Sequence, residues 1–222
     1  MRSALAALTV LLPWPVRRLV LQRFFGYRIH PTCRIGFSCV LARSLVMEEH
    51  SSIGHLTMCR RIDLLHLGSH SVIGTLNFIT GQPSDSKLRH YHDCPERRPQ
   101  LLLGRHSVIT SRHHLDCTDR VEIGEFSAVG GRGSTFFTHG IDISANRQRP
   151  EPISIGDYCL MGTSCVVLAG ASLPDYCVLG AMSLVDRALV ESHQLYGGVP
   201  ARAIKPLPED AEYFRRTEGR VI

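Results

Sequence analysis

A single histidine, His139, stands in a polar stretch where it could serve as a general base. The stretch reads FFTHGIDISANRQRPEP over residues 136–152. It ends with two prolines, just before the chain returns to a regular pattern. A neutral imidazole near its ordinary pKa can take a proton from an attacking hydroxyl group. The sequence therefore predicts acid–base chemistry at this loop, and the alternative is an exposed loop histidine without a chemical role.

The segment SRHHLDCTD, residues 111–119, holds a second set of reactive side chains. The carboxylate of Asp116 could bind a substrate hydroxyl or orient an imidazole, and a simple turn aspartate is the alternative. His114 lies two residues before it, and Asp142 follows His139 by three residues. We expect Asp116, His114 and Asp142 to bind an acceptor substrate.

A six-residue rhythm of apolar side chains surrounds these residues and must position them. Each of the first five apolar members of the longest run is followed four positions later by a small residue. The apolar members are Ile155, Met161, Val167, Leu173, Leu179 and Val185. The small residues are Cys159, Cys165, Ala171, Cys177 and Ser183.

The same rhythm appears earlier with breaks, so that it covers most of residues 33–188. Its earlier members are Ile35, Leu41, Met47 and Ile53, then Leu67, Ile73 and Ile79, then Leu103, Ile109 and Leu115, then Ile123 and Val129. A period of six suits neither an α-helix nor a simple hairpin. It fits three straight sides that close a triangular coil, with the large residue inside and stacked coils pairing as parallel strands.

This rhythm predicts an all-β solenoid with additional segments at both ends. We expect an N-terminal helical segment over 1–30, the β-helix over 31–189, loop excursions at 81–100 and 138–152, and a closing segment with a short helix over 190–222. The first loop is polar and contains three prolines. An acceptor-binding arm built from Arg89, His90, Tyr91 and His92 and a mobile surface excursion are both open interpretations.

Composition narrows the class of partner. The net charge of +5 is mild and scattered over 222 residues, which favours a solvated surface over a nucleic-acid interface. Eight cysteines include no CxxC pair, so a thiol-rich zinc site is disfavoured and reduced thiols in the cytoplasm are expected. Cys39, Cys159, Cys165 and Cys177 take the small inward position, whereas the frame leaves Cys94 and Cys117 free to be exposed near loops.

The N-terminal apolar run over residues 4–12 is too short to span a bilayer, and Pro13 and Pro15 interrupt it. It lacks the small-residue cleavage site of a signal peptide. An amphipathic helix over residues 1–25 is predicted instead. A cap on the protein and peripheral contact with the inner face of a membrane are both open.

The closing segment VLGAMSLVDRALVESHQLYGGVPARAIKPL, residues 178–207, adds a specific motif to the repeat. Together they resemble the hexapeptide-repeat acyltransferases, in particular the O-acetyltransferases of sugar and polysaccharide biosynthesis. The resemblance covers about residues 33–207. It implies a left-handed parallel β-helix, acetyl-CoA as cosubstrate, no metal, a homotrimer with active sites between subunits, and His139 as general base. In similar enzymes an acidic or amide side chain near Asp116 holds the acceptor sugar, and this segment is expected about one and a half coils before His139.

The resemblance also implies a cofactor site on the last coils. The residues expected to hold acetyl-CoA are Gly162, Gly180, Ala181, Ser183, Pro200, Ala201, Arg202 and Lys205. Arg202 and Lys205 would face the cofactor phosphates. Met182 stands where the family usually has glycine. Ala169 stands where the family often has proline.

Three other functions are weighed beside O-acetylation. An N-acyltransferase acting on an amino sugar or nucleotide sugar would use the same scaffold. A zinc carbonic anhydrase would need three histidine ligands, and only His50 and His55 have a suitable spacing. A non-catalytic binding scaffold would leave His139 dispensable.

Overall fold

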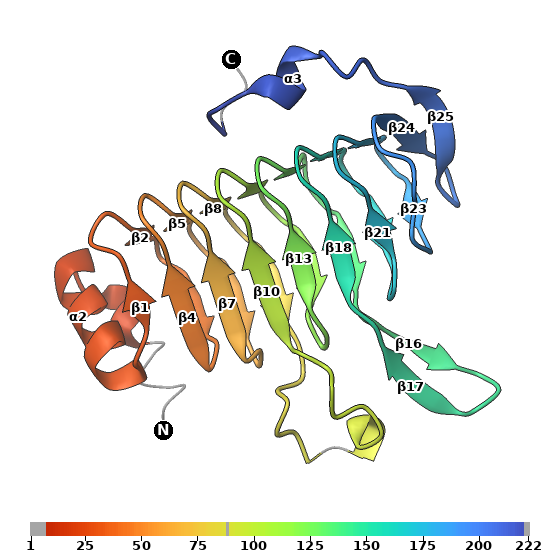
Figure 1. Ribbon diagram of the computed structural model, residues 1–222. Coiled ribbons are helices and arrows are strands. Elements are labelled where there is room, and N and C mark those ends of the chain that lie inside the picture. Colours follow the sequence, from red (N-terminus) through yellow and green to blue (C-terminus); the bar gives the residue numbers. More distant parts are fainter. Residues whose placement is uncertain (1–7, 88, 220–222) are drawn as a thin grey trace.

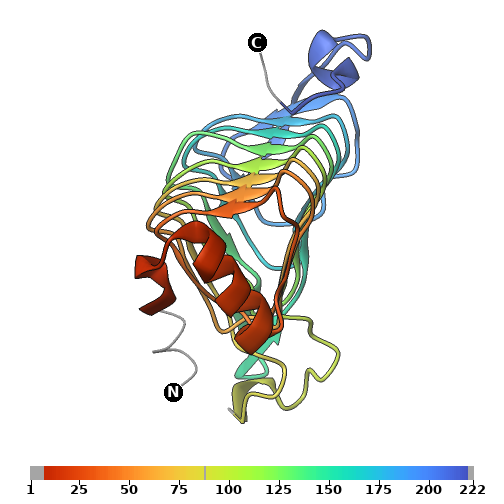
Figure 2. The same ribbon diagram turned by 90° about the vertical axis from the view of Figure 1, so that its left-hand side faces the viewer.

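The computed structural model describes residues 8–87 and 89–219, and these form a left-handed parallel β-helix with three flat faces (Figures 1 and 2). Short strands follow one another around each coil, and every coil adds one strand to each of three sheets. The remaining parts of the expected terminal segments, residues 1–7 and 220–222, lie outside the described residues, as does residue 88 in the first loop.

The first sheet consists of β1 (Arg28–Ile29), β4 (Ser44–Met47), β7 (Leu64–Leu67), β10 (Gln100–Leu103), β13 (Val121–Ile123), β18 (Ile153–Ile155) and β21 (Ser172–Leu173). The second consists of β2 (Arg34–Ile35), β5 (Ser52–Ile53), β8 (Val72–Ile73), β11 (Val108–Ile109), β14 (Ala128–Val129), β19 (Leu160–Met161), β22 (Val178–Leu179), β24 (Gln194–Gly197) and β25 (Arg202–Pro206). The third consists of β3 (Cys39–Leu41), β6 (Met58–Arg60), β9 (Phe78–Thr80), β12 (His114–Asp116), β15 (Thr135–Phe137), β20 (Val166–Val167) and β23 (Leu184–Val185).

Stacking of the coils places equivalent residues directly above one another. The pairing between coils is parallel, whereas the closing pair β24–β25 is antiparallel. Glycine is required at the corners where backbones approach most closely. A Cβ atom on Gly74 would lie 2.3 Å from the carbonyl oxygen of Thr110 in the next coil.

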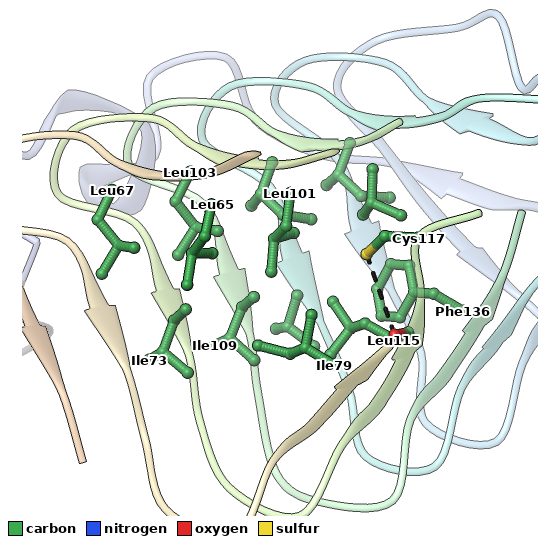
Figure 3. Packing of buried hydrophobic residues seen from close by; sticks show 14 of the residues in the cluster. Leu65, Leu67, Ile73, Ile79, Leu101, Leu103, Ile109, Leu115, Cys117 and Phe136 are labelled. Carbon is green, nitrogen blue, oxygen red and sulfur yellow. Dashed lines mark hydrogen bonds between the residues drawn. The ribbon is translucent and has the colours of Figure 1, made fainter. Parts of the chain in front are cut away.

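The interior is a continuous apolar column, which Figure 3 shows in its central coils. All six apolar members of the longest predicted run are buried, and so are the five small residues that follow them. The prediction of large residues inside and small residues near the corners is therefore confirmed for this run. The largest fully buried side chain is Phe136, which lies on the strand that leads to His139.

The predicted phase is wrong in the first coil. Val40 points inward there, and its neighbours Cys39 and Leu41 are only partly buried on the outer face. The turn after Ile35 is one residue shorter than in the following coil, where Ile53 and Cys59 are the inward pair. A fixed step of six from Ile35 therefore reaches Leu41 instead of Val40.

The predicted exposure of Cys117 is also wrong. Its side chain is fully buried beside Leu115 and Phe136 (Figure 3), and burial raises the pKa of the thiol well above its ordinary value. The chain turns inward again immediately after Asp116, which places Cys117 at a corner inside the prism. Cys94 lies in the first loop and is partly buried.

A helix closes the N-terminal end of the prism, as Figure 2 shows. After the short 3₁₀ turn η1 (Thr9–Leu11), α2 (Trp14–Phe25) begins at the prolines that were expected to interrupt the segment. Proline is tolerated in the first turn of a helix, where its missing N–H would be unpaired anyway. The buried guanidinium of Arg17 donates hydrogen bonds to the carbonyl oxygens of Gly36 and Ser38, and this ties the helix to the first coil.

One corner of the prism carries a ladder of stacked rings. Its members are His50, His70, His106, Phe126, Tyr158, Tyr176 and His193, with successive ring centres 4.7 to 5.4 Å apart. The C-terminal segment crosses this ladder through α3 (Glu212–Arg215). Phe214 packs edge-on against Tyr176, and the guanidinium of Arg216 lies over the ring of Tyr158.

Candidate active site

Two excursions leave the prism on the same side (Figure 1). The first runs between β9 and β10 and contains the 3₁₀ turn η2 (Arg89–Tyr91). The second is a two-stranded antiparallel hairpin, β16 (His139–Asp142) and β17 (Arg147–Pro150), rather than the irregular loop that the sequence suggested. His139 is therefore the first residue of a strand, at the point where the hairpin joins the third sheet.

Thr138 fixes the base of this hairpin. Its side chain is fully buried, its Oγ1 accepts a hydrogen bond from the backbone N–H of Asp119 at 2.9 Å, and its carbonyl oxygen accepts one from Glu151 at 2.8 Å. Both ends of the hairpin are thus tied to the prism at one residue. Because His139 follows directly, its imidazole starts from a rigid backbone.

Asp116 lies beside His139 on the neighbouring coil. Strand β12 pairs with β15 so that Asp116 is opposite Phe137, two residues before His139. The two residues are therefore one coil apart, closer than the one and a half coils expected. The Nδ1 atom of His139 lies 3.0 Å from Oδ1 of Asp116, and these side chains form an ion pair when the imidazole is protonated.

The carboxylate of Asp116 is held in place by further hydrogen bonds. Its Oδ1 accepts from the backbone N–H of Thr118 at 3.1 Å and lies 3.1 Å from the hydroxyl of Thr138. Its Oδ2 lies 3.4 Å from the hydroxyl of Thr118. A carboxylate with several donors around it cannot rotate freely, so it presents a fixed acceptor to His139.

The electrostatics of the pair follow from this contact. The hydrogen bond from His139 raises the pKa of the imidazole above its ordinary value, although burial opposes the rise. Burial alone would raise the pKa of Asp116, but His139 and the donors of Thr118 outweigh it, so the carboxyl pKa is lowered. Asp116 is therefore ionised at neutral pH and stabilises positive charge on the imidazole.

This geometry selects one tautomer of His139. An ionised carboxylate only accepts, so Nδ1 must carry the hydrogen and Nε2 is the free basic nitrogen. The side chain of His139 is 30 % exposed, whereas that of Asp116 is 12 % exposed. The imidazole can therefore meet a substrate while its carboxylate partner stays shielded, as in an oriented general base.

The first loop packs over this pair. The ring of Tyr91 meets the imidazole of His139 edge-on, with ring centres 6.4 Å apart, and its hydroxyl donates to Oε1 of Gln148 in the hairpin at 2.5 Å. Burial raises the pKa of Tyr91, so the phenol is neutral. The guanidinium of Arg97 lies over the tyrosine ring, 4.8 Å from its centre, and donates to the carbonyl oxygens of Pro83 and Thr118.

A pocket of about 520 Å³ opens between the loop and the hairpin. Its wall includes His90, Cys94, Ile141, Arg147 and Arg149. The sequence left this loop open as an acceptor-binding arm or a mobile surface excursion, and it indicated no partner for it. Contacts of Arg97 and Gln148 with Tyr91 were missed, because nothing in either segment marks which residues of two distant loops will meet.

His114 lies on the same outward face of β12 as Asp116. Its ring contacts Phe78 at 5.2 Å and Phe137 at 5.9 Å between ring centres. Its Nε2 atom is buried and has no hydrogen-bond partner among the described residues. By contrast, the neighbouring His113 is buried in the scaffold, where its Nδ1 accepts from the backbone of Ser134.

Asp142 lies toward the tip of the hairpin. It forms an ion pair with Arg149 at 3.2 Å and accepts a hydrogen bond from the backbone of Ala145. These contacts stabilise the hairpin. They do not bring Asp142 together with His139 and Asp116.

The expected cofactor residues gather at the last coils. Gly162 lies directly beneath Ala181, where a Cβ atom would come within 2.6 Å of the Ala181 nitrogen. Ser183 donates to the carbonyl of Gly180 and accepts from the N–H of Gly198. These contacts tie the last corner to the closing turn.

The closing turn continues this surface. The N–H of buried Ala201 donates to the carbonyl of Leu184 at 2.7 Å, and Pro200 precedes it. Arg202 and Lys205 are exposed on β25. Exposed cations at this position can bind phosphate groups. Arg202 and Lys205 would look the same if they were ordinary surface cations.

Metal-type donors are dispersed in the described residues, 8–87 and 89–219. There, no group of three or more histidine, cysteine, aspartate or glutamate side chains could hold a metal ion. His50 stacks on His70 in the ring ladder, whereas the ring of His55 contacts Phe37 at a different corner. The two histidines whose spacing suggested a carbonic anhydrase therefore lie at different corners of the prism and do not face one metal site.

No protein-family model matches the sequence, and no curated protein matches it. Solved structures do match. AntD, an N-acyltransferase from Bacillus cereus in complex with dTDP and 3-hydroxybutyryl-CoA, superposes with a TM-score of 0.54 at 15 % identity, covering 74 % of this chain and 81 % of that chain. The chain has the fold of the hexapeptide-repeat transferases.

Two further structures agree. The polySia specific acetyltransferase NeuO gives a TM-score of 0.51 at 16 % identity, covering 84 % of this chain and 80 % of that chain. A hexapeptide transferase family protein from Anaplasma phagocytophilum gives 0.51 at 14 % identity, covering 82 % and 87 %. At these identities the likeness concerns the fold alone, so a function must be argued from the residues of the site.

Proposed function

We propose that this protein is an acetyl-CoA-dependent O-acetyltransferase that modifies a hydroxyl group of a sugar or polysaccharide precursor. The observation that carries the proposal is the contact between Nδ1 of His139 and the ionised carboxylate of Asp116. This contact leaves Nε2 of an accessible imidazole as a base. The pocket between the loop and the hairpin is connected to it through Tyr91, which contacts His139 and bonds to Gln148 in the pocket wall. Hydroxyl acylation by a thioester requires such a base.

The proposed reaction is direct transfer in a ternary complex. Nε2 of His139 takes the hydroxyl proton while the oxygen attacks the thioester carbonyl and forms the new C–O bond. The tetrahedral intermediate then collapses, the C–S bond breaks, and the imidazolium returns the proton to the departing thiolate. Asp116 stabilises the positive charge that His139 carries between these two steps.

Acceptor recognition is assigned to the residues around the base. His114 lies on the same side of β12 as Asp116. Its ring contacts Phe78 and Phe137 and would shape the acceptor site there, since its Nε2 is buried. Tyr91 covers the imidazole of His139 and limits access from the side of the first loop. Asp142 is assigned only an indirect role, through the shape of the hairpin.

Acetyl-CoA is placed in the proposal along the last coils. Backbone groups at the partly exposed coil edges around Gly162, Gly180 and Ala181 would pair with the pantetheine amides. Arg202 and Lys205 would meet the cofactor phosphates. The complexes of AntD with CoA and with 3-hydroxybutyryl-CoA lend support by analogy of fold only.

The active assembly is proposed to be a homotrimer. The third sheet presents partly exposed apolar side chains beside the base, including Phe78 and Phe137. A second prism packed on this face would cover them and close the cleft beside His139. Cyclic symmetry allows three copies to satisfy the same face at once.

The Asp116–His139 pair also bears on the choice between O- and N-acylation. An amine attacks as its free base and needs less help from a general base than a hydroxyl does. A carboxylate-oriented imidazole therefore favours a hydroxyl acceptor. The N-acyltransferase alternative predicts faster thiol release with amino sugars.

The test is a transfer assay with purified protein, acetyl-CoA and matched hydroxyl and amino acceptors, read by release of free thiol. Wild-type protein should acylate hydroxyl acceptors, and His139→Ala should lower kcat by roughly 10²–10⁴ with little change in the affinity for CoA. Cys94→Ser should remain active, because no cysteine forms an acyl intermediate in direct transfer.

A matched control comes from a second histidine–carboxylate pair. Nε2 of His66 lies 3.0 Å from Oε1 of Glu48 on the first sheet, away from the two excursions. His66→Ala removes a similar pair without touching the proposed base and should retain activity. A His139→Ala enzyme that runs at the wild-type rate, or a trapped acetyl-cysteine, would overturn the assignment.

A further inference from the structure

Helix α2 packs on the prism through one face and exposes apolar side chains on the other. Its inner face contacts the prism through Leu21 and Phe25. Its outer face carries Val16 and Leu19, and Leu19 is 63 % exposed. A cluster of exposed apolar side chains marks a surface that contacts protein or lipid, and this helix also exposes the cation of Arg23.

The apolar surface extends beyond this helix. Seven of the seventeen exposed large hydrophobic side chains among the described residues fall within residues 8–37: Leu8, Leu11, Leu12, Val16, Leu19, Phe24 and Phe37. Leu11 is 79 % exposed and Phe24 is 69 % exposed. We refer to these seven residues as the cap surface. It lies at the end of the prism that faces the viewer in Figure 2, away from the last coils.

The chain segment that forms the cap surface carries charge of one sign, although Glu48 and Glu49, just beyond it, line a hollow together with Arg28. Residues 1–47 contain seven arginines and none of the 20 acidic residues of the chain, although the net charge of the whole protein is only +5. The exposed cations here are Arg23, Arg28 and Arg34. Arg43 is different, because it pairs with Asp63 and Asp85 outside this region.

A hollow indents the cap surface. It has a volume of about 370 Å³ and is lined by the chain around Leu11, Trp14 and Phe37, together with the first coil at Ile35. Its walls are mostly apolar, and the buried cation of Arg17 lies at its base. An apolar hollow of this kind can receive an acyl chain, while the exposed arginines of the same segment can meet an anionic headgroup.

We propose that the cap surface docks the protein on a bilayer that contains anionic phospholipids. The exposed leucine and phenylalanine side chains enter the boundary between headgroups and acyl chains, and the arginines meet the lipid phosphates. Docking requires no membrane-spanning segment. Among the described residues, no helix is long and apolar enough to cross a bilayer.

The charge pattern also distinguishes this occupant from a second copy of the chain. Two cap surfaces packed on each other would bring together two copies of residues 8–37, a segment that contains arginines and no acidic residue. An anionic bilayer neutralises the same arginines and covers the apolar side chains between them. The inference is independent of the proposed acetyl transfer, since its readout is binding to vesicles.

The test is flotation of the full chain with vesicles of phosphatidylcholine alone and of phosphatidylcholine mixed with phosphatidylglycerol. The protein should float with the mixed vesicles and bind less as ionic strength rises, because salt screens the arginine–phosphate attraction. Leu19→Glu with Phe24→Glu should lower the partition coefficient by at least about tenfold. Replacing Arg23, Arg28 and Arg34 by glutamine should abolish the preference for the anionic vesicles.

The matched control is Val190→Glu, which adds the same charge at another exposed apolar position, outside the cap surface. It should bind vesicles like wild type. Circular dichroism and the transfer assay check that all variants keep the fold. Three outcomes would overturn the proposal: no binding to mixed vesicles, equal binding to both vesicle types at every ionic strength, or folded cap variants that bind like wild type.

Discussion

The replacement Asp116→Asn isolates the charge of the proposed pair from its geometry. Oδ1 of Asp116 faces three donors, from His139, Thr118 and Thr138, whereas Oδ2 lies near only the hydroxyl of Thr118. An asparagine with its oxygen at the Oδ1 position keeps all three contacts. Its amide nitrogen can donate to the hydroxyl of Thr118, so the tautomer of His139 is preserved.

The expected loss is therefore electrostatic. At a separation near 4 Å, opposite unit charges attract by about 4 kcal/mol at an effective dielectric constant of ~20. His139 is 30 % exposed, so solvent screens part of this attraction. A remaining effect of about 1.5–2 kcal/mol on the transition state corresponds to a decrease in kcat of roughly 10- to 30-fold.

Asp116→Ala removes the orientation of the imidazole as well as the charge. It should approach the loss expected for His139→Ala, roughly 10²–10⁴ in kcat. Glu122→Gln is the matched control, because it neutralises an exposed carboxylate on the next strand along the chain, where the partner is Arg120 at 3.5 Å. This control should retain full activity.

The pH profile provides a second readout. The hydrogen bond to Asp116 raises the pKa of His139, so wild-type activity should fall as the pH drops through that raised value. Without the negative charge the pKa decreases, and the acidic limb of the Asp116→Asn profile should move to lower pH. An unmoved limb, or equal losses for the asparagine and alanine variants, would refute the proposed division between charge and orientation.

Three other predictions concern the scaffold. Phe136→Ala should destabilise the fold by about 3–5 kcal/mol in chemical denaturation, because this ring fills the core beneath the hairpin; a loss below about 1 kcal/mol would contradict that packing. Burial lowers the pKa of His113 to about 4 from an ordinary value of 6.5, so its contribution to stability is fully present above pH 6.5 and lost as the pH falls toward 4. That contribution is at most about 3 kcal/mol, and thermal unfolding of His113→Asn should depend less on pH than that of wild type across this window. Light scattering should give about three times the chain mass of 24.7 kDa, and a fully active monomer would oppose the interface site.

The longest repeat predicts the fold well because burial in this prism depends on position alone. From Ile155 to Val185 no residue is inserted or lost, and a step of six tracks every inward side chain. The first coil shows the limit of the pattern. One residue fewer at a corner moved the inward position from Leu41 to Val40, and apolar character could not reveal this, since both residues are apolar.

The ring ladder was missed although the sequence carries its signal. Each ring lies three residues before an inward residue of the second sheet, as His50 lies before Ile53 and Tyr158 before Met161. Histidine, phenylalanine and tyrosine share this corner, so no single residue type repeats. The common property is a flat ring, and it becomes visible only after the coils are aligned.

The Asp116–His139 pair marks the boundary between what the repeat can and cannot predict. The sequence identified both residues, but their contact depends on the length of one coil. Asp116 and Phe137 are 21 positions apart and lie opposite each other, because this coil is longer than the 18 residues that separate Met161 from its stacked partner Leu179. A regular count of 18 from Asp116 reaches Ser134 and leaves His139 further around the prism. The longer coil shifts the hairpin back over Asp116, so the irregularity that obscures the register in the sequence is also what forms the pair.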